Sequence, residues 1–370
     1  MAKGGRFLTK KPVKPRRRGK WLLIVILILL LLIGVAIAAG AVYYNSMLNL
    51  ITRPETVATE HSMSDEEFEA ILGYVPEKME ATETTVETTQ APTEPKEDHI
   101  VNIMLIGQNY RKGEEHKLSD TLILCSLNKE TKTLTLTSFL RDLYLQLPNY
   151  KGHICGKNRI NVAYNLGWYW ENELAGMEML DMVIQNNFGV EVDYNVEVGF
   201  VAFKQIIDAL GGVDMELTAD EAQYITMDAE VNGSYSAGMT HLNGEAALSY
   251  ARIRHANAGD NDFNRTNRQR KLIIEILNQC RSKSLGELNN MLQEMLPLII
   301  TDMTNKEITD LALELLPMLK DLKIVSNQCP APDTYTMGMV EIGGMDASVI
   351  HCDLEKNGAL LQEIAEMPES

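Results

Sequence analysis

Residues 122–139 read LILCSLNKETKTLTLTSF, and this stretch decides the fold class. Two apolar runs flank a polar turn at residues 128–133, and leucine alternates with threonine in the second run. Alternation with a period of two beside a short turn predicts a β-hairpin. The apolar run VNIMLIG at residues 101–107 comes shortly before the hairpin and predicts a further strand.

Helices and strands are intermixed in the chain that follows. Helices are predicted at residues 174–187 and 200–210, with the strand-like run YNVEVGF between them and VDMEL after them. Residues 285–322 predict two amphipathic helices, followed by strands flanked by cysteines and a last helix at 353–366. Short hairpin connections therefore predict an α/β fold with three α-β-α layers around a mixed, largely antiparallel central sheet.

The N-terminal part of the chain predicts a membrane anchor. Residues 21–44 carry no charge, and 24 residues are enough to cross a bilayer as a helix. Nine Lys and Arg residues and no acid precede this run, so the positive-inside rule places residues 1–20 in the cytoplasm. A cleaved signal peptide is the alternative, because small residues occur near the end of the run. We therefore expect a single-pass cell-membrane protein whose C-terminal part is extracellular.

Composition divides the rest of the chain. Residues 45–98 are acidic and rich in Thr, Glu and Pro, which predicts an extended stalk. A globular domain is expected at residues 99–282. Residues 283–370 are expected to be an extension packed on the same domain, with a small independent domain as the alternative. The formal charge of −17 in spite of the basic tail argues against a nucleic-acid-binding protein.

Five cysteines are an odd number for a compartment in which disulfides form. Cys329 and Cys352 flank a short region rich in strand formers and turns, and we expect them to pair. Cys125 and Cys280 are expected to pack as small apolar residues, whereas the sequence does not place Cys155. A zinc site is not expected, because the sequence has no CxxC or HExxH spacing.

Basic residues are concentrated at residues 252–270, RIRHANAGDNDFNRTNRQR, which hold five arginines in an acidic chain. Arg252 and Arg254 are two apart, so on an extended strand they would project from the same face. Arginine binds phosphate oxygens bidentately, so this concentration predicts a phosphate-binding site. A solvated basic loop and helix is the alternative.

A helix is predicted to follow this strand, with Asp262 as its N-cap. Arg265, Arg268 and Gln269 then lie at i, i+3 and i+4 on one helical face. Guanidinium groups at the start of a helix would lie where backbone N–H groups already favour an anion.

Charged pairs also occur at the predicted strand ends. Ser119 and Asp120 precede one strand, and Arg141 and Asp142 follow another. An ordinary turn and a surface ion pair are the alternatives. The sequence has no GxSxG elbow and no Walker loop, so serine nucleophile chemistry and nucleotide hydrolysis have little support.

Taken together, these stretches closely resemble the LytR-CpsA-Psr family of cell-envelope proteins over about residues 102–277. The similar stretches are NIMLIGQNYR, SDT, SFLRD, KNRIN, LGGV, LNGEAALSYARIRH and DFNRTNRQ. The resemblance implies a transferase that moves a glycan, such as teichoic acid or capsule polysaccharide, with its phosphate from a polyprenyl-pyrophosphate carrier to a peptidoglycan hydroxyl. A pyrophosphatase side activity is also expected.

The resemblance also implies roles for individual residues. It assigns the pyrophosphate to Arg111, Arg141, Arg252, Arg254, Arg265, Arg268 and Gln269. Further substrate contacts are expected from Lys117, Lys157 and Asn161. Asp142 and Asp262 are candidates either for orienting arginines or for accepting the proton of the acceptor hydroxyl.

Mg²⁺ is the expected cofactor, held by Asp120 and bridging the phosphates. The family usually has a second carboxylate in the loop after the first strand, and this chain has Asn109 there. Its amide oxygen can coordinate a cation, but the site loses one negative charge. Lys117 stands where an arginine is common and keeps the charge without the planar fork.

Two other functions remain open from the sequence. One is a noncatalytic scaffold that binds polyprenyl phosphate, and the other is a membrane-bound transcription attenuator. A polyprenyl tail would need an apolar slot, to which the helical face of Phe200, Phe203, Ile206, Ile207 and Leu210 could contribute; an ordinary core face is the alternative.

Overall fold

The computed structural model describes residue 40 and residues 42–54, 77–78, 99–108, 119–257 and 261–366. The chain divides into two compact units, Met1–Asn49 and Leu50–Ser370, and the fold below is that of the second. Most of the predicted membrane span and stalk lies outside the described residues. Within the described part of the chain, no helix has the length and apolar character needed to cross a bilayer.

A six-stranded mixed sheet forms the centre of the second unit, in the order β11-β8-β2-β3-β4-β12. Its strands are β2 Ile100–Gln108, β3 Ser119–Asn128, β4 Thr133–Phe139, β8 Tyr194–Gly199, β11 Ile300–Thr301 and β12 Lys323–Cys329. The pairs β2–β3, β3–β4 and β8–β11 are antiparallel, whereas β2–β8 and β4–β12 are parallel. The predicted hairpin is therefore confirmed as β3–β4, within a mixed sheet.

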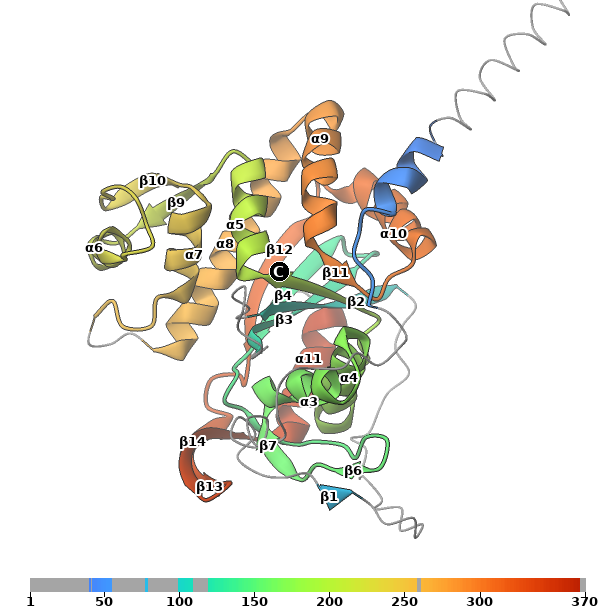
Figure 1. Ribbon diagram of the computed structural model, residues 1–370, viewed down its shortest axis with the longest axis vertical. Helices are drawn as coiled ribbons and strands as arrows, with labels where there is room; N and C mark the ends of the chain where they lie inside the picture. The colour runs from blue at the N-terminus through green and yellow to red at the C-terminus, as the bar shows by residue number, and fades with distance from the viewer. Residues whose placement is uncertain are drawn as a thin grey trace, which may run out of the picture. The chain divides into compact units, whose positions relative to one another are not determined.

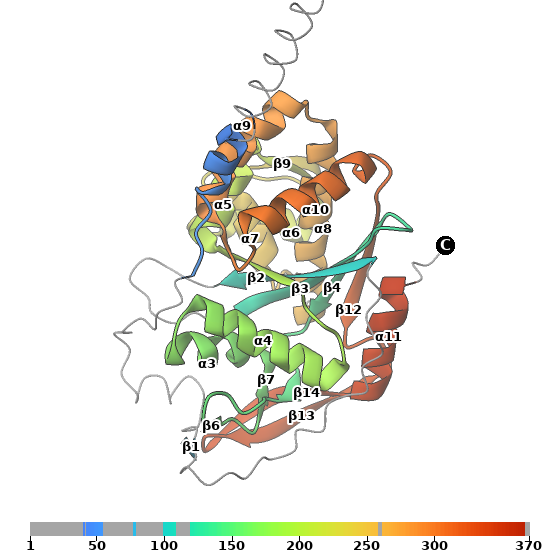
Figure 2. The same ribbon diagram turned by 90° about the vertical axis from the view of Figure 1, so that its right-hand side faces the viewer.

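Helices cover both faces of this sheet (Figures 1 and 2). One face packs against α3 Ala163–Trp170, α4 Glu173–Phe188 and α11 Leu354–Glu366. The opposite face carries α5 Phe200–Ala209, α7 Gly244–Arg252, α8 Asp262–Ser282 and α9 Leu285–Met295, and α10 Asn305–Met318 follows. Alternate residues of β2 are buried on the α4 side, because successive side chains of a strand point to opposite faces.

Sequence-local signals explain where several helices begin and end. The Asn172 side chain accepts a hydrogen bond from Ala175 N at 3.1 Å and caps α4, which ends at the left-handed Gly189. Asn243 caps α7 in the same way. For α8, the cap is Asn261 and Asp262 is the first helical residue, so the predicted cap is displaced by one position.

The remaining elements lie beside the central sheet. They include η1 Ile160–Val162, η2 Leu296–Leu298 and α6 Ala219–Met227. The small two-stranded sheets pair β1 Glu77–Lys78 with β6 His153–Ile154, β5 Tyr144–Gln146 with β7 Lys157–Arg159, β9 Val213–Leu217 with β10 Gly238–Leu242, and β13 Tyr335–Ile342 with β14 Met345–Cys352. The VDMEL strand thus lies outside the central sheet.

One local prediction of a strand is wrong. Residues 252–254 do not form a strand: α7 continues to Arg252 because its apolar face, including Ala247 and Tyr250, is buried in the helical layer.

The predicted bridge between Cys329 and Cys352 is not formed, and both side chains are thiols. Both side chains belong to the core that packs around α4. Burial raises the pKa of both thiols, to about 11 for Cys352, so each packs as a protonated apolar group.

Candidate functional site

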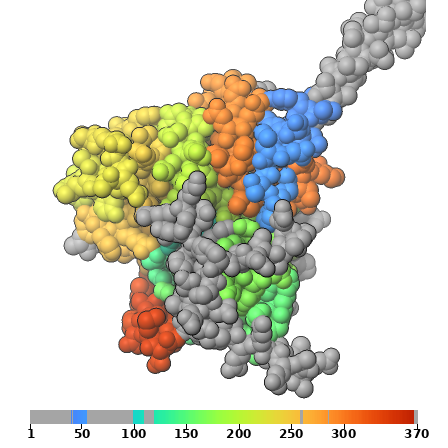
Figure 3. Space-filling model, viewed as in Figure 1, coloured from blue at the N-terminus to red at the C-terminus, as the bar shows by residue number. Residues whose placement is uncertain are grey.

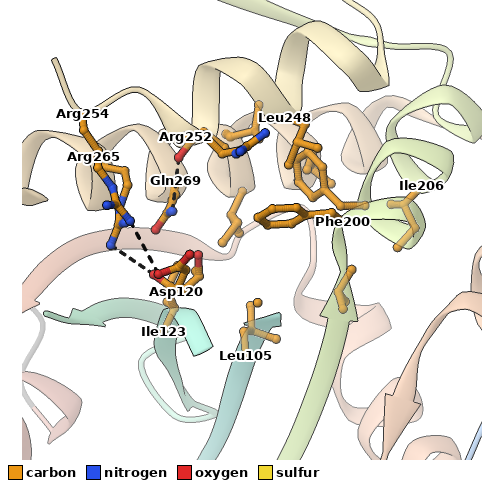
Figure 4. A pocket seen from close by; sticks show the side chains of 18 of the residues that line it. Leu105, Asp120, Ile123, Phe200, Ile206, Leu248, Arg252, Arg254, Arg265 and Gln269 are labelled. Carbon is orange, nitrogen blue, oxygen red and sulfur yellow. Dashed lines mark hydrogen bonds and ion pairs between the residues drawn. The ribbon is translucent and has the colours of Figure 1, made fainter. Parts of the chain in front are cut away.

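A pocket of about 930 Å³ lies between the central sheet and the layer formed by α5, α7 and α8 (Figure 4). The sheet contributes Leu105, Ile123, Val196 and Val198, which point to the face opposite α4. The helices contribute Phe200, Phe203, Ile206, Leu248, Leu272, Ile273 and Ile276. Most of the lining is therefore apolar, and its charged residues come from the ends of the surrounding elements.

The predicted apolar face of α5 is divided between this pocket and the core. Phe200, Phe203 and Ile206 line the pocket, whereas Ile207 and Leu210 are buried in the helical layer without lining it. One half of the helix thus serves the cavity and the other half holds the helix in place.

Asp120 is the centre of the charged end of the pocket. Its Oδ1 lies 2.9 Å from Arg141 Nη1 and 3.6 Å from Arg254 Nη2. Its backbone carbonyl accepts a hydrogen bond of 3.1 Å from Arg265 Nη2. Figure 4 shows Arg254 and Arg265 directed at Asp120. Arg141 and two arginines of the 252–270 stretch therefore meet at the strand end that carries Asp120.

The end of β2 is closely packed against the start of β3. Gly107 of β2 lies opposite Thr121 of β3, next to a register shift between Gly107 and Gln108. A Cβ at position 107 would lie 2.7 Å from the Thr121 Cβ, so glycine allows the two strands to approach here. This contact fixes the strand end that carries Asp120.

Arg265 is the most deeply buried charge of the site, with 2% of its side chain exposed. Its Nη2 lies 2.9 Å from Asp262 Oδ1, one turn earlier on α8. Burial lowers the pKa of Arg265 to about 10, and the positive charges of Arg141 and Arg254 act in the same direction, whereas Asp262 opposes them. The guanidinium remains charged near neutral pH and lacks full compensation by carboxylates.

Arg141 also links this group to the carboxylate of Asp142. Its Nε lies 3.7 Å from Asp142 Oδ2 and 3.8 Å from Asp262 Oδ1. Burial lowers the pKa of Arg141, but the carboxylates of Asp262, Asp142 and Asp120 together raise it above its ordinary value. Arg159, on β7, extends the cluster by placing Nη1 3.7 Å from Asp142 Oδ1.

Arg252 lines the same pocket but points away from Asp120. Its Nη1 lies 3.5 Å from Glu230 Oε2, and its guanidinium lies over the Phe200 ring at 5.1 Å from the centroid. Figure 4 shows this side chain beside Leu248 and Phe200. The structure therefore separates Arg252 from the three arginines at Asp120.

Arg268 and Gln269 are buried on the predicted face of α8 but differ in their contacts. Arg268 lies outside the pocket lining, and its Nε donates to Glu221 Oε1 at 2.7 Å. Burial raises the pKa of Glu221, but the hydrogen bond and charge of Arg268 and the hydrogen bonds from Thr218 together outweigh burial, so the net shift is downward. Gln269 lines the pocket and donates from Nε2 to the Ala251 carbonyl at 3.2 Å.

Lys157 and Asn161 lie on the other side of Arg141. Lys157 is exposed on β7, and Asn161 is buried in η1, where its N–H donates to the Arg141 carbonyl at 3.3 Å. Neither residue lines the pocket. Arg111, Lys117 and Asn109 lie outside the described residues.

Metal ligands of the predicted kind were also sought in the structure. Among the residues that the structure describes, no group of three or more His, Cys, Asp or Glu side chains could together hold a metal ion. The carboxylate of Asp120 is about 20% exposed at the pocket. Of the two predicted cation ligands, Asp120 and Asn109, Asp120 is the one that the structure describes.

A protein-family model matches most of this chain. The model of the LytR_cpsA_psr family matches residues 71–350. The chain belongs to this family. The match includes every described residue of the charged cluster, from Asp120 to Arg268.

Similar curated proteins come from bacilli. The chain is 30% identical over 185 residues to "Polyisoprenyl-teichoic acid--peptidoglycan teichoic acid transferase TagV" of Bacillus subtilis, covering 50% of this chain and 44% of that protein. It is 29% identical over 211 residues to TagU of Bacillus licheniformis, covering 57% and 62%. The chain thus spans about half to two thirds of these relatives.

Solved structures of the family share the fold. The chain is 24% identical, with a TM-score of 0.59, to protein gbs0355 of Streptococcus agalactiae, covering 72% of this chain and 86% of that one. It is 21% identical, with a TM-score of 0.52, to a structure titled "LytR-CPS2A-psr family protein YwtF (TagT) with bound octaprenyl pyrophosphate lipid", covering 75% and 95%. At these identities the likeness concerns the fold alone.

Sequence reasoning missed several residues of this site in the LytR_cpsA_psr chain. The pocket-lining residues of the strands could have been found from alternation, because Leu105 and Ile123 face away from α4. Glu230 and Arg159 carry no local signal, since their partners Arg252 and Asp142 are distant in the sequence.

Proposed function

We propose that this protein is a membrane-anchored glycopolymer transferase that moves a glycan with its phosphate from a polyprenyl diphosphate to a peptidoglycan hydroxyl. The observation that carries the proposal is the meeting of Arg141, Arg254 and Arg265 with Asp120 at an apolar pocket of about 930 Å³. Such a cavity matches an amphiphile with an anionic head and a long apolar tail.

Family members support the class of substrate. The names of TagU and TagV describe transfer of teichoic acid from a polyisoprenyl carrier to peptidoglycan. The structure titled as YwtF contains octaprenyl pyrophosphate. We carry this substrate class over because the charged residues and the apolar lining of the present chain occur together in one cavity.

The arginines have a role at the diphosphate that follows from their geometry. Arg254 and Arg265 present guanidinium groups beside the pocket, and Arg265 is held rigidly by Asp262. Buried positive charge stabilises the negative charge that develops on the phosphates during transfer, without reorganisation of water. Arg141 contributes a third positive charge at Asp120 Oδ1.

Mg²⁺ is the cofactor that we assign. A Mg²⁺ site commonly uses one or two carboxylates and completes its octahedron with water and substrate phosphate. The donor set fits such a site, because Asp120 offers a partly exposed carboxylate at the pocket and Asn109, which precedes it in the sequence, has an amide oxygen. The ion would supply charge neutralisation at the diphosphate.

The transfer step exchanges one phosphorus–oxygen bond for another. The acceptor hydroxyl oxygen attacks the glycan-linked phosphorus, and the bond from that phosphorus to the bridging oxygen breaks, so lipid monophosphate leaves. We assign to the Asp142 carboxylate the role of accepting the proton of the acceptor hydroxyl. Asp262 is held by Arg265 at 2.9 Å, whereas the contacts of Asp142 with Arg141 and Arg159 are both 3.7 Å long.

A reconstituted reaction tests this proposal. Full-length protein in detergent micelles is mixed with Mg²⁺, a polyprenyl-diphosphate glycan and peptidoglycan. We expect lipid monophosphate and peptidoglycan-bound glycan phosphate to form in equal amounts, and chelation of Mg²⁺ to slow both. Bound lipid without turnover would instead support the noncatalytic scaffold, for which the absence of a carboxylate at Asn109 is the specific observation.

The location of the folded domain is part of the same proposal. We place the folded domain on the extracellular side of the membrane because nine basic residues and no acid precede the predicted span. Protease added to intact cells is expected to cleave the domain. Full protection in intact cells, with cleavage after lysis, would contradict the transferase and favour the transcription attenuator.

A further inference from the structure

Arg252 is held by a carboxylate at the pocket instead of taking part in the cluster at Asp120. Its Nη1 lies 3.5 Å from Glu230 Oε2, and its guanidinium lies over the ring of Phe200. Arg254, two residues later, points at Asp120 from the same pocket. The positive charge of Arg252 is therefore paired with a protein carboxylate in this structure.

Glu230 is brought to Arg252 by a chain of specific contacts. Asp228 Oδ1 accepts a hydrogen bond from Glu230 N at 3.0 Å. Asp228 Oδ2 accepts a hydrogen bond from the Ser249 hydroxyl at 2.6 Å. Ser249 belongs to α7, the helix that ends at Arg252. The segment after α6 is thus fastened to the same helix that carries the arginine.

The whole contact lies on the pocket. Residues 227–230 line the cavity together with Phe200, Leu248 and Arg252. Figure 3 shows the yellow region that contains α6 next to α5 on one face of the unit. A ligand that fills the cavity must therefore pass beside Glu230 or displace its contact with Arg252.

The ion pair of Arg252 and Glu230 is weak enough for another anion to replace Glu230. The side chains are 36% exposed for Arg252 and 60% for Glu230, so water screens their attraction. A diphosphate carries several negative charges and matches the arginine fork, whereas the contact between Glu230 and Arg252 is 3.5 Å long. Diphosphate is the stronger partner for Arg252.

We propose that Glu230 is a positioning residue that holds Arg252 away from the cluster at Asp120, and that the diphosphate of the lipid substrate takes Arg252 over. This inference rests on the proposed function. Glu230 then lowers the affinity for the lipid diphosphate and keeps the pocket arginine neutralised when the pocket holds no phosphate.

Binding of octaprenyl diphosphate to the full-length protein in detergent micelles tests the inference by calorimetry. Glu230→Gln keeps the shape of the side chain and removes its charge, so we expect tighter binding by about two- to fivefold, the range of an exposed ion pair. Glu216→Gln is the matched control, because Glu216 is an exposed carboxylate on β9 and does not line the pocket. It is expected to leave the affinity unchanged.

A second background separates a positioning role from a general charge effect. In Arg252→Ala, the change Glu230→Gln is expected to have no effect on affinity, because Glu230 acts through Arg252. Ser249→Ala, which removes the link to Asp228, is expected to tighten binding in the same direction as Glu230→Gln. Equal or weaker binding by Glu230→Gln overturns the inference, as does the same gain in the Arg252→Ala background.

The two proposals fail in different ways. A wild-type protein that does not bind octaprenyl diphosphate overturns the proposed function and this inference together. A wild-type protein that binds it, with no gain in Glu230→Gln, overturns only the role of Glu230.

Discussion

Arg265 shows how a single residue links the fold to the proposed chemistry. It is a buried residue of α8, is held by Asp262 and donates to the carbonyl of Asp120. Even with its pKa lowered to about 10 by burial, the side chain carries a positive charge near neutrality. The protein thus keeps an incompletely compensated charge beside an apolar cavity, which a bound diphosphate would neutralise.

Replacing Arg265 tests this role at the residue scale. We expect Arg265→Ala to lower the transfer rate by about 10²-fold, the usual effect of removing one donor to developing charge. Transfer of glycan phosphate to peptidoglycan is the measurement, with thermal unfolding recorded in parallel. Lys271→Ala removes a positive charge from an exposed position of the same helix and is the matched control. A folded Arg265→Ala protein with wild-type transfer would contradict the role.

Residue pairings divide into those that the sequence could predict and those that it could not. The helical period correctly predicts that Arg265, Arg268 and Gln269 share one face of α8. It does not predict that Arg268 is paired with Glu221, because that carboxylate lies 47 residues earlier, on α6. The roles assigned to the arginines remain predictions.

At the scale of elements, the close contact of α3 with α4 depends on two glycines. A Cβ at Gly167 would collide with the carbonyl of Ala175, and a Cβ at Gly176 would lie 2.8 Å from the carbonyl of Tyr164. The two helices bury much of the core on their side of the sheet, where the strand end with Arg141 is anchored.

We expect Gly167→Ala to separate these helices and to lower the free energy of unfolding by about 3 kcal/mol or more. Chemical denaturation is the measurement. Gly286→Ala is the control, because no atom lies within 4 Å of a Cβ at that position of α9. The control is expected to be neutral or to gain up to about 1 kcal/mol of stability. Equal stability of the two variants would contradict the packing of α3 on α4.

Hydrogen bonds from the Asn195 side chain join β8 to α4 and to the segment after β11. The Nδ2 of Asn195, on β8, donates to Asp181 of α4 at 2.8 Å and to Asp302 at 2.9 Å. Burial raises the pKa of Asp181 to about 8, the bond from Asn195 opposes this shift, and Asp302, Glu178 and Asp193 add to it.

The sign of the pH dependence follows from this shift. Between pH 3.8 and about 8 the unfolded chain releases the proton of Asp181 while the folded protein keeps it, so stability falls as pH rises through this window. We expect Asp181→Asn to weaken this fall, seen as a difference in melting temperature that grows from pH 4 to about pH 8. Asp346→Asn, in an exposed position of β14, is expected to retain the wild-type dependence. A constant difference for Asp181→Asn would contradict the assignment.

Element boundaries could be predicted where local signals are strong. The helix at 174–187 is confirmed as α4, since Asn172 and Gly189 mark its ends. The strand at 252–254 was wrong because two arginines flanking an isoleucine fit a strand locally, whereas burial of α7 against the helical layer decides the structure.

At the scale of the whole molecule, the C-terminal part completes the central sheet. Strand β12 pairs in parallel with β4 along seven residues, and β11 pairs with β8 at the other edge. The mixed α/β class could be predicted from alternation and short turns. The parallel edge strand could not, because β12 lies far along the chain and pairing between distant strands leaves no local pattern.

The pocket is a property of the whole molecule for the same reason. Its lining comes from three strands of the sheet and from α5, α6, α7 and α8, with both apolar and charged residues. The sequence predicted the arginines from their concentration, and it left the apolar face of α5 open between a slot wall and an ordinary core face. The cavity itself depends on the spacing between layers, which no single stretch encodes.

A structure of the full-length protein with octaprenyl diphosphate is the most direct test of the central claim. We expect a diphosphate in contact with Arg254 and Arg265 beside Asp120, and an isoprenoid tail between β2, β8 and α5. A structure in which the lipid is bound elsewhere, with this pocket closed or filled by side chains, would contradict it.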